Sequence, residues 1–69
     1  MKISARNLLA GTVTRIHAGA VNAEVILKLE GGAEVTSVVT LDALNELWLK
    51  VGVKAYAIVK ASNVILAVD

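Results

Sequence analysis

Polar residues with hydrogen-bond donors cluster at two places in an otherwise apolar chain of 69 residues. The first cluster is Ile3-Ser4-Ala5-Arg6-Asn7, which holds a hydroxyl, a guanidinium and an amide. The second is Lys60-Ala61-Ser62-Asn63, near the other end of the sequence. A fixed cation flanked by neutral donors suits a small anion, because every group offered can donate a hydrogen bond. The two segments are therefore predicted to be the two halves of an anion site.

Ordinary structural roles remain open for the same residues. Arg6 and Lys60 can be solvated surface cations, and Ser4 and Ser62 can satisfy backbone groups in turns. Catalysis is not expected, because the chain has no cysteine and no serine lies beside its one histidine, His17.

The length and composition predict a single small domain, residues 1–69, that associates with copies of itself. A chain of this size buries only about 60% of its unfolded surface, so a monomer is marginal. Because the chain has no cysteine, neither disulfides nor a thiolate metal site can stabilise it. Its single histidine cannot form a zinc site without carboxylate ligands. No directly coordinating metal site is expected. The sequence is 57% hydrophobic, with a mean hydropathy of +0.70. Such apolar content favours subunits that share a core.

Charge and hydropathy argue against nucleic-acid and membrane partners. The net charge is +1, with only Trp48 and Tyr56 as aromatic residues for base stacking. The uncharged runs at 7–14 and 35–41 are far shorter than the roughly 20 residues of a spanning helix. No secretory signal is recognisable, so a cytoplasmic location is expected.

The pattern of β-branched residues and glycines predicts five strands and one short helix. The predicted strands are Leu9–Ile16, Ala23–Leu29, Glu34–Thr40, Lys54–Lys60 and Val64–Val68, and the helix is Thr40–Leu47. Residues 17–22 are expected to form a loop, residues 30–33 a hairpin turn, and residues 61–63 a tight corner. Thr40 is expected to cap the helix. An all-β chain with a helix between strands three and four has the element order of a small five-stranded OB-like barrel.

The whole chain resembles the molbindins, the small Mop-type molybdate/tungstate-binding domains of the TOBE/OB-like family. The opening pentapeptide at residues 3–7 and the lysine-serine corner carry the most specific part of the resemblance. The further matches are Gly11, Ala23-Glu24-Val25, Gly31-Gly32, Thr36-Ser37, Leu41-Asp42, Gly52 and Lys60-Ala61-Ser62. A domain of this kind that stands alone resembles the free-standing form used for intracellular storage or homeostasis of the oxyanion.

The resemblance implies a homohexamer, built as a trimer of dimers, with molybdate or tungstate bound between subunits and no organic cofactor. The oxyanion-binding residues it implies are Ser4, Ala5, Arg6, Lys60 and Ser62, with Thr40 from a neighbouring subunit. A second site near the three-fold axis is implied at Gly19, Ala20, Val21 and Asn22. Two departures bear on this. Ala43 stands where a relative can have serine, and Trp48 stands where glycine is frequent, so Trp48 is expected to pack over the helix end or a subunit contact.

The chemistry of the two clusters agrees with that ligand. Molybdate is a tetrahedral dianion that only accepts hydrogen bonds, and neither segment contains a carboxylate to repel it. Monohydrogen phosphate carries a proton that needs an acceptor, so a site made only of donors disfavours it by about 1–3 kcal/mol. The alternative is an oligomeric structural or regulatory module that recognises a protein partner and holds no oxyanion.

Overall fold

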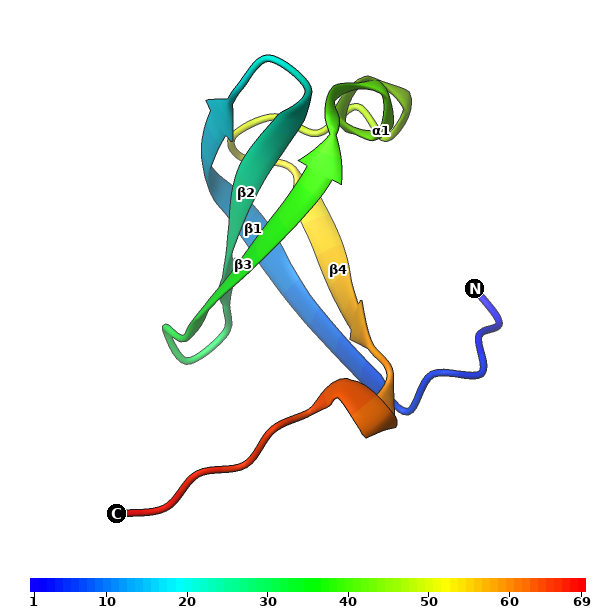
Figure 1. The fold of residues 1–69 in the computed structure, drawn as a ribbon, viewed down its shortest axis with the longest axis vertical. Coiled ribbons are helices and arrows are strands. Elements are labelled where there is room, and N and C mark those ends of the chain that lie inside the picture. The colour runs from blue at the N-terminus through cyan, green and yellow to red at the C-terminus, as the bar shows by residue number, and fades with distance from the viewer.

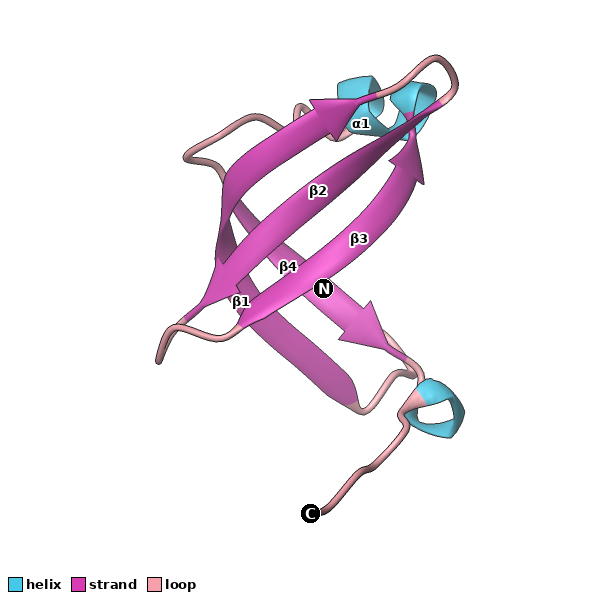
Figure 2. Ribbon diagram, turned by 60° about the vertical axis from the view of Figure 1, so that its left-hand side comes forward, coloured by secondary structure: helices cyan, strands magenta, loops and turns pink.

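Four strands form one antiparallel sheet in the order β3-β2-β1-β4 (Figure 1). The computed structural model describes residues 1–69. The strands are β1 (Asn7–Ala18), β2 (Asn22–Leu29), β3 (Glu34–Thr40) and β4 (Lys54–Val59), with α1 (Leu41–Glu46) between β3 and β4, and the 3-10 turn η1 (Ala61–Asn63) after β4. The sheet curls as in Figure 2, so the chain is an all-β, OB-like half-barrel with one short helix.

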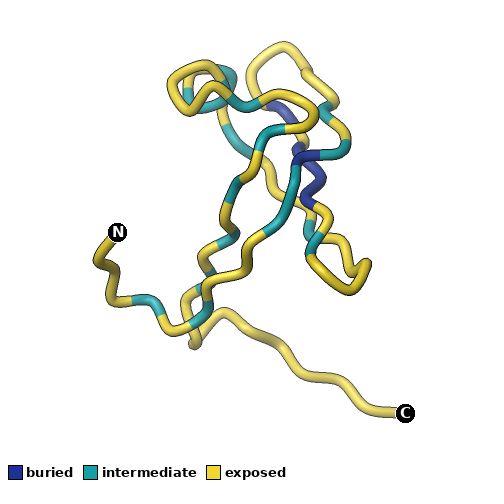
Figure 3. Tube along the Cα trace, turned by 180° about the vertical axis from the view of Figure 1, so that it is seen from behind, coloured by how far each residue is buried: buried dark blue, intermediate teal, exposed yellow.

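All five fully buried residues lie on the two central strands, β1 and β2. They are Val13 on β1 and Ala23, Val25, Ile26 and Leu27 on β2. Ala23, Val25 and Leu27 lie on one face of β2, and Val13 packs with Val25 and Leu27. Ile26 lies on the opposite face of the strand and is also buried. All other residues are half-buried or exposed (Figure 3).

Two local features curl β1 around β2. The strand register shifts between Val13 and Arg15, so Thr14 has no Cα partner and forms a bulge, and its hydroxyl donates to the Ile26 carbonyl at 3.4 Å. At Gly11, an added Cβ would lie 2.7 Å from the Lys28 carbonyl oxygen. Only glycine permits this close approach of two strands.

The β2–β3 connection is the predicted hairpin turn. Gly31 and Gly32 have φ values of +90° and +97°, which side chains rarely tolerate. The turn is closed by a hydrogen bond from the Leu29 N–H to the Ala33 carbonyl at 2.8 Å. It places β3 antiparallel to β2, with Ser37 opposite Val25.

Thr40 caps α1 as predicted, since its side-chain oxygen accepts a hydrogen bond from the Ala43 N–H at 3.1 Å. The helix lies over one end of the sheet (Figure 1). Its Leu44 packs against the buried cluster, whereas Leu47, just beyond the helix, is 63% exposed.

Two sequence predictions need correction. The fifth strand expected at Val64–Val68 is not confirmed: the segment has no strand beside it, and residues 65–69 make no backbone hydrogen bond. The barrel is accordingly not closed within one chain. His17, expected in a loop, lies on β1 opposite Glu24, because β1 extends to Ala18 and the turn takes only residues 19–21. The remaining strand boundaries differ from the predicted ones by two residues or fewer.

The isolated chain exposes more surface than a folded protein of its mass. Its accessible surface is 5649 Å². A compact monomer of 7.2 kDa exposes about 4,100 Å², so roughly 1,500 Å² is in excess. The radius of gyration, 12.8 Å, likewise exceeds the roughly 11 Å expected for this length. Surface of this extent is comparable to that buried in a stable protein–protein interface.

Candidate functional site

The two donor-bearing segments leave the same end of the β1–β4 strand pair. Asn7, the first residue of β1, is the register partner of Val59, the last residue of β4. The Asn7 side-chain amide also donates to the Val59 carbonyl at 3.0 Å. Ser4, Ala5 and Arg6 immediately precede this pair and Lys60 to Ser62 immediately follow it, so the fold brings both segments to one end (Figure 1).

The donors at this end are free. Ser4, Arg6, Lys60 and Ser62 are exposed and Ala5 is half-buried. Side-chain hydrogen bonds within the chain involve only Asn7, Thr14 and Thr40. The two hydroxyls and two cations therefore donate to no protein group. We refer to residues 4–6 and 60–62 together as the donor end.

Thr40 and the predicted second site lie at the opposite end of the sheet, next to α1 (Figure 1). Thr40 is the register partner of Asn22. The Leu41 N–H donates to the Val21 carbonyl at 3.0 Å, and the Gly19 N–H donates to the Asn22 carbonyl at 2.8 Å. Thr40 therefore does not reach the donor end of its own chain. The sequence resemblance had implied that Thr40 contributes from a neighbouring subunit. Thr40 instead adjoins Gly19 to Asn22.

Trp48 does not pack over the helix end within the chain. Its side chain is 83% exposed, and its φ of +54° lies in the left-handed region. That conformation is normal for glycine just beyond a helix and unfavourable for tryptophan. Glycine would take this conformation without strain. Ala43, the other departure, is half-buried on α1.

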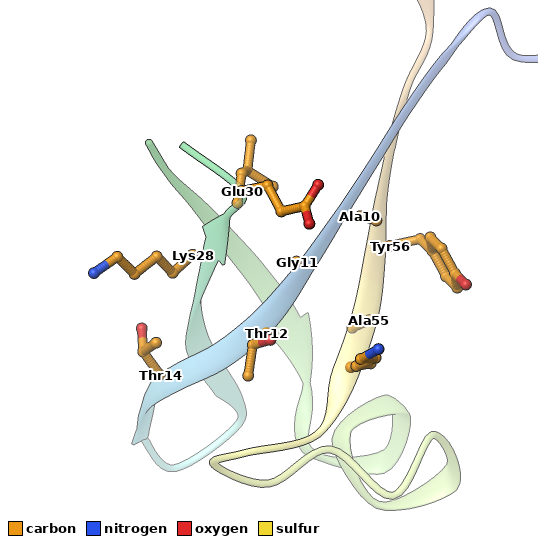
Figure 4. A pocket seen from close by; sticks show the side chains of 10 residues that line it. Ala10, Gly11, Thr12, Thr14, Lys28, Glu30, Ala55 and Tyr56 are labelled. Carbon is orange, nitrogen blue, oxygen red and sulfur yellow. The ribbon is translucent and has the colours of Figure 1, made fainter. Parts of the chain in front are cut away.

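The two main hollows of the surface are not lined by the donor end. One lies on the outside of β1, where its lining includes Thr12, Lys28 and Lys54. The side chains of Lys28 and Tyr56 point away from one another there, so its polar groups do not converge on one point (Figure 4).

The other hollow is an apolar groove between the unpaired edges of β3 and β4. Its volume is about 560 Å³, and twelve of its fifteen lining residues are hydrophobic. Val35 and Val39 line it from β3, and Ala57 and Val59 from β4. Sequence reasoning missed this groove because it predicted a five-stranded barrel, which has no open groove between these strands. The available signal was that Val35 and Val39 lie four residues apart, on one face of β3.

No group of three or more histidine, cysteine, aspartate or glutamate side chains is placed to hold a metal ion. None of the helices is both long and apolar enough to cross a membrane.

Comparison with known proteins agrees over nearly the full length. The family model of the TOBE domain matches residues 3–66. A probable molybdenum-pterin-binding protein of Haemophilus influenzae is 51% identical over 69 residues, covering all of both chains.

Two solved structures share the fold. MopII from Clostridium pasteurianum, in an apo form, superposes with a TM-score of 0.91 at 42% identity, covering 97% of this chain and all of MopII. The cytoplasmic molybdate-binding protein ModG, with molybdate bound, superposes with a TM-score of 0.96 at 59% identity. This chain is covered completely in that match and spans 49% of ModG. The chain belongs to the TOBE-domain family, as a molbindin, the Mop-type domain of that family.

Proposed function

We propose that this protein is a single-domain binder of molybdate and tungstate that sequesters the oxyanion without altering it. The observation that carries the proposal is the match of the entire chain to ModG, which has molybdate bound, at 59% identity and a TM-score of 0.96. A cytoplasmic role in storage or homeostasis accords with ModG, which is described as cytoplasmic.

The donor end is our proposed site, made by Ser4, Ala5, Arg6, Lys60 and Ser62. What supports it is that both segments flank the Asn7–Val59 pair and that their side-chain donors have no protein partner. The ligand fits this site by charge and by hydrogen bonding. Molybdate is a dianion that only accepts hydrogen bonds, and the site offers a guanidinium, an ammonium and two hydroxyls as donors. Molybdate and tungstate share charge and shape, so this site takes both.

Completion of the site requires a second subunit. One chain leaves the donor end open to water, and Thr40 lies at the other end of the sheet. We propose that Thr40 of a neighbouring subunit reaches the oxyanion. Its hydroxyl accepts a hydrogen bond from Ala43 within its own helix and still has its proton to donate. The excess surface supports self-association, for which a hexamer built as a trimer of dimers, with five-stranded barrels, is the proposed form.

The second proposed site comprises Gly19, Ala20, Val21 and Asn22. These residues form the exposed β1–β2 turn and offer backbone N–H groups and one amide. The turn lies beside Thr40. A neighbouring subunit that approaches Thr40 therefore also approaches this turn, which supports an oxyanion site between subunits there.

The alternative function is an oligomeric structural or regulatory module that recognises a protein partner and holds no oxyanion. The exposed Trp48 and its neighbours Leu47 and Val51 favour it, since each is more than 60% exposed. Metal analysis of the purified oligomer separates the two functions, because the alternative predicts an oligomer that stays empty after dialysis against molybdate.

A thermal-shift measurement tests the proposed function directly. Free molybdate at about 100 times its Kd stabilises the form that binds it by about 2.7 kcal/mol, which raises the Tm of a domain this small by roughly 10 °C or more. Tungstate should act similarly. Phosphate at equal concentration should raise the Tm much less than molybdate does, because its proton finds no acceptor. Absence of a shift with both molybdate and tungstate would refute the proposal.

A further inference from the structure

The two halves of the donor end are not hydrogen-bonded to each other. Residues 1–6 form no backbone hydrogen bond, and the two backbone hydrogen bonds formed after Val59 only close the turn η1 on itself. The side chains of the donor end form no hydrogen bond within the chain either. The spacing between the two halves therefore depends on the strand pair from which both segments leave.

That strand pair ends at Asn7 and Val59, and a side chain reinforces its last step. Asn7 begins β1, Val59 ends β4, and the two residues are register partners. The Asn7 amide crosses between the strands and donates to the Val59 carbonyl at 3.0 Å. Of the three side-chain hydrogen bonds in the chain, this one joins the residues farthest apart in the sequence, at a separation of 52 positions.

A reinforcement has the greatest effect at this place in the sheet. The last pair of two strands opens first, because it is supported by neighbouring pairs on one side only. Asn7 is half-buried, so fewer water molecules compete for its hydrogen bond than at an exposed position. An amide suits the position because it donates to a carbonyl without carrying a charge. A carboxylate of the same size could not donate, and it would place a negative charge beside the donor end.

We infer that Asn7 is the positioning residue of the oxyanion site. Arg6 directly precedes Asn7 and Lys60 directly follows Val59, so the amide fixes the point from which both cations extend (Figure 1). When the last pair is closed, the two cations are held at one spacing and can bind the same anion. When it is open, the anion must order both segments as it binds, and this cost lowers its affinity.

This inference rests on the proposed function and deepens it. The donor end supplies the groups that contact the oxyanion, whereas Asn7 acts through Arg6 and Lys60 by setting the spacing between them. Its amide is therefore expected to change how tightly the anion is held without being one of the groups that bind it.

Isothermal titration of molybdate into the variant Asn7→Ala tests this role. The variant should bind molybdate about three- to tenfold more weakly than the natural protein, the factor that corresponds to one neutral hydrogen bond. The matched control is Thr14→Val, which removes the hydrogen bond from a side chain to the neighbouring strand at the bulge in β1. Thr14 lies outside the donor end, so the control should bind normally. Size-exclusion chromatography verifies that both variants assemble.

A double-mutant cycle separates positioning from a general structural role. If Asn7 acts by aligning Lys60 with Arg6, then Asn7→Ala should have almost no further effect on the molybdate affinity of a Lys60→Ala variant. A general loss of structure would weaken binding by the same factor in both backgrounds. If Asn7→Ala does not assemble, Asn7→Asp keeps the size of the side chain and removes its donor. That variant should lose more than about tenfold in affinity, because its carboxylate also repels the dianion.

The outcomes distinguish this inference from the proposed function. If the natural protein binds molybdate and the assembled Asn7 variant binds it equally tightly, the positioning role is refuted and the proposed function stands. The same loss of affinity in Thr14→Val, or the same loss in both backgrounds of the cycle, would also refute the role. If the natural protein itself binds no molybdate, the proposed function fails, and the role of Asn7 fails with it.

Discussion

Arg6 and Lys60 stand on either side of the Asn7–Val59 pair, one before β1 and one after β4. Both are exposed and neither donates to a protein group. Cations that stabilise a fold usually meet a carboxylate or a carbonyl oxygen. These two keep their donors free for water, a ligand or a neighbouring subunit.

Replacing both cations tests that conclusion. The variant Arg6→Ala with Lys60→Ala should lose at least a hundredfold in molybdate affinity by isothermal titration, because each charged hydrogen bond contributes about 1.5–3 kcal/mol. Assembly should be retained. The charge-matched control, Lys28→Ala with Lys50→Ala, removes two exposed lysines elsewhere and should bind normally. Unchanged molybdate affinity in the Arg6→Ala, Lys60→Ala variant would show that the site lies elsewhere than at the donor end.

Among the elements, α1 has the least typical ending. It runs from Leu41 to Glu46 with Thr40 as its N-cap, and Leu47 is the C-cap. The next residue, Trp48, takes the left-handed conformation that glycine adopts at such ends. Left-handed backbone costs a residue with a Cβ about 1–2 kcal/mol, and the exposed indole regains little of it by packing within the chain.

The variant Trp48→Gly should therefore raise the free energy of unfolding by about 1 kcal/mol. Chemical denaturation of the variant and the natural protein measures the difference, and Lys50→Gly serves as a control because Lys50 is exposed in the same connection. A less stable Trp48→Gly variant would show that another subunit covers the indole in the assembly. That outcome would agree with the subunit contact expected from the sequence.

The strand pattern was predictable wherever pairing partners lie within the chain. Ala23–Leu29 and Glu34–Thr40 are joined by two glycines, so their antiparallel pairing follows from local sequence. Val64–Val68 has the composition of an apolar strand, but the structure gives it no pairing partner within the chain. His17 was misplaced because no residue before Gly19 signals the end of β1. For the donor end, the residue types were evident, whereas its location depends on the register of Asn7 with Val59, which only the fold provides.

At the scale of the whole molecule, five buried residues in 69 are a small core. Conformational entropy of about 1–2 kcal/mol per residue opposes folding, and such limited burial offsets it poorly. The excess surface of roughly 1,500 Å² has the extent of an interface. We therefore expect stability to be shared between subunits and to depend on their concentration.

Dilution should therefore lower the Tm. Each tenfold decrease in protein concentration should shift the unfolding transition downward, as scanning calorimetry over several concentrations would measure, and saturating molybdate should reduce the dependence. A Tm that is constant on dilution would show that the single chain is stable alone. Size-exclusion chromatography at the same concentrations provides the control for assembly.

The position of the core also sets an order of events during synthesis. Every buried residue lies on β1 or β2, which are neighbours in sequence joined by the turn at residues 19–21. Such a hairpin forms from local contacts within microseconds. The segment Val64–Val68 is synthesised after all four strands and has no strand beside it within its own chain. A growing chain can thus form its buried centre before the donor end is complete, because Lys60 and Ser62 follow β4.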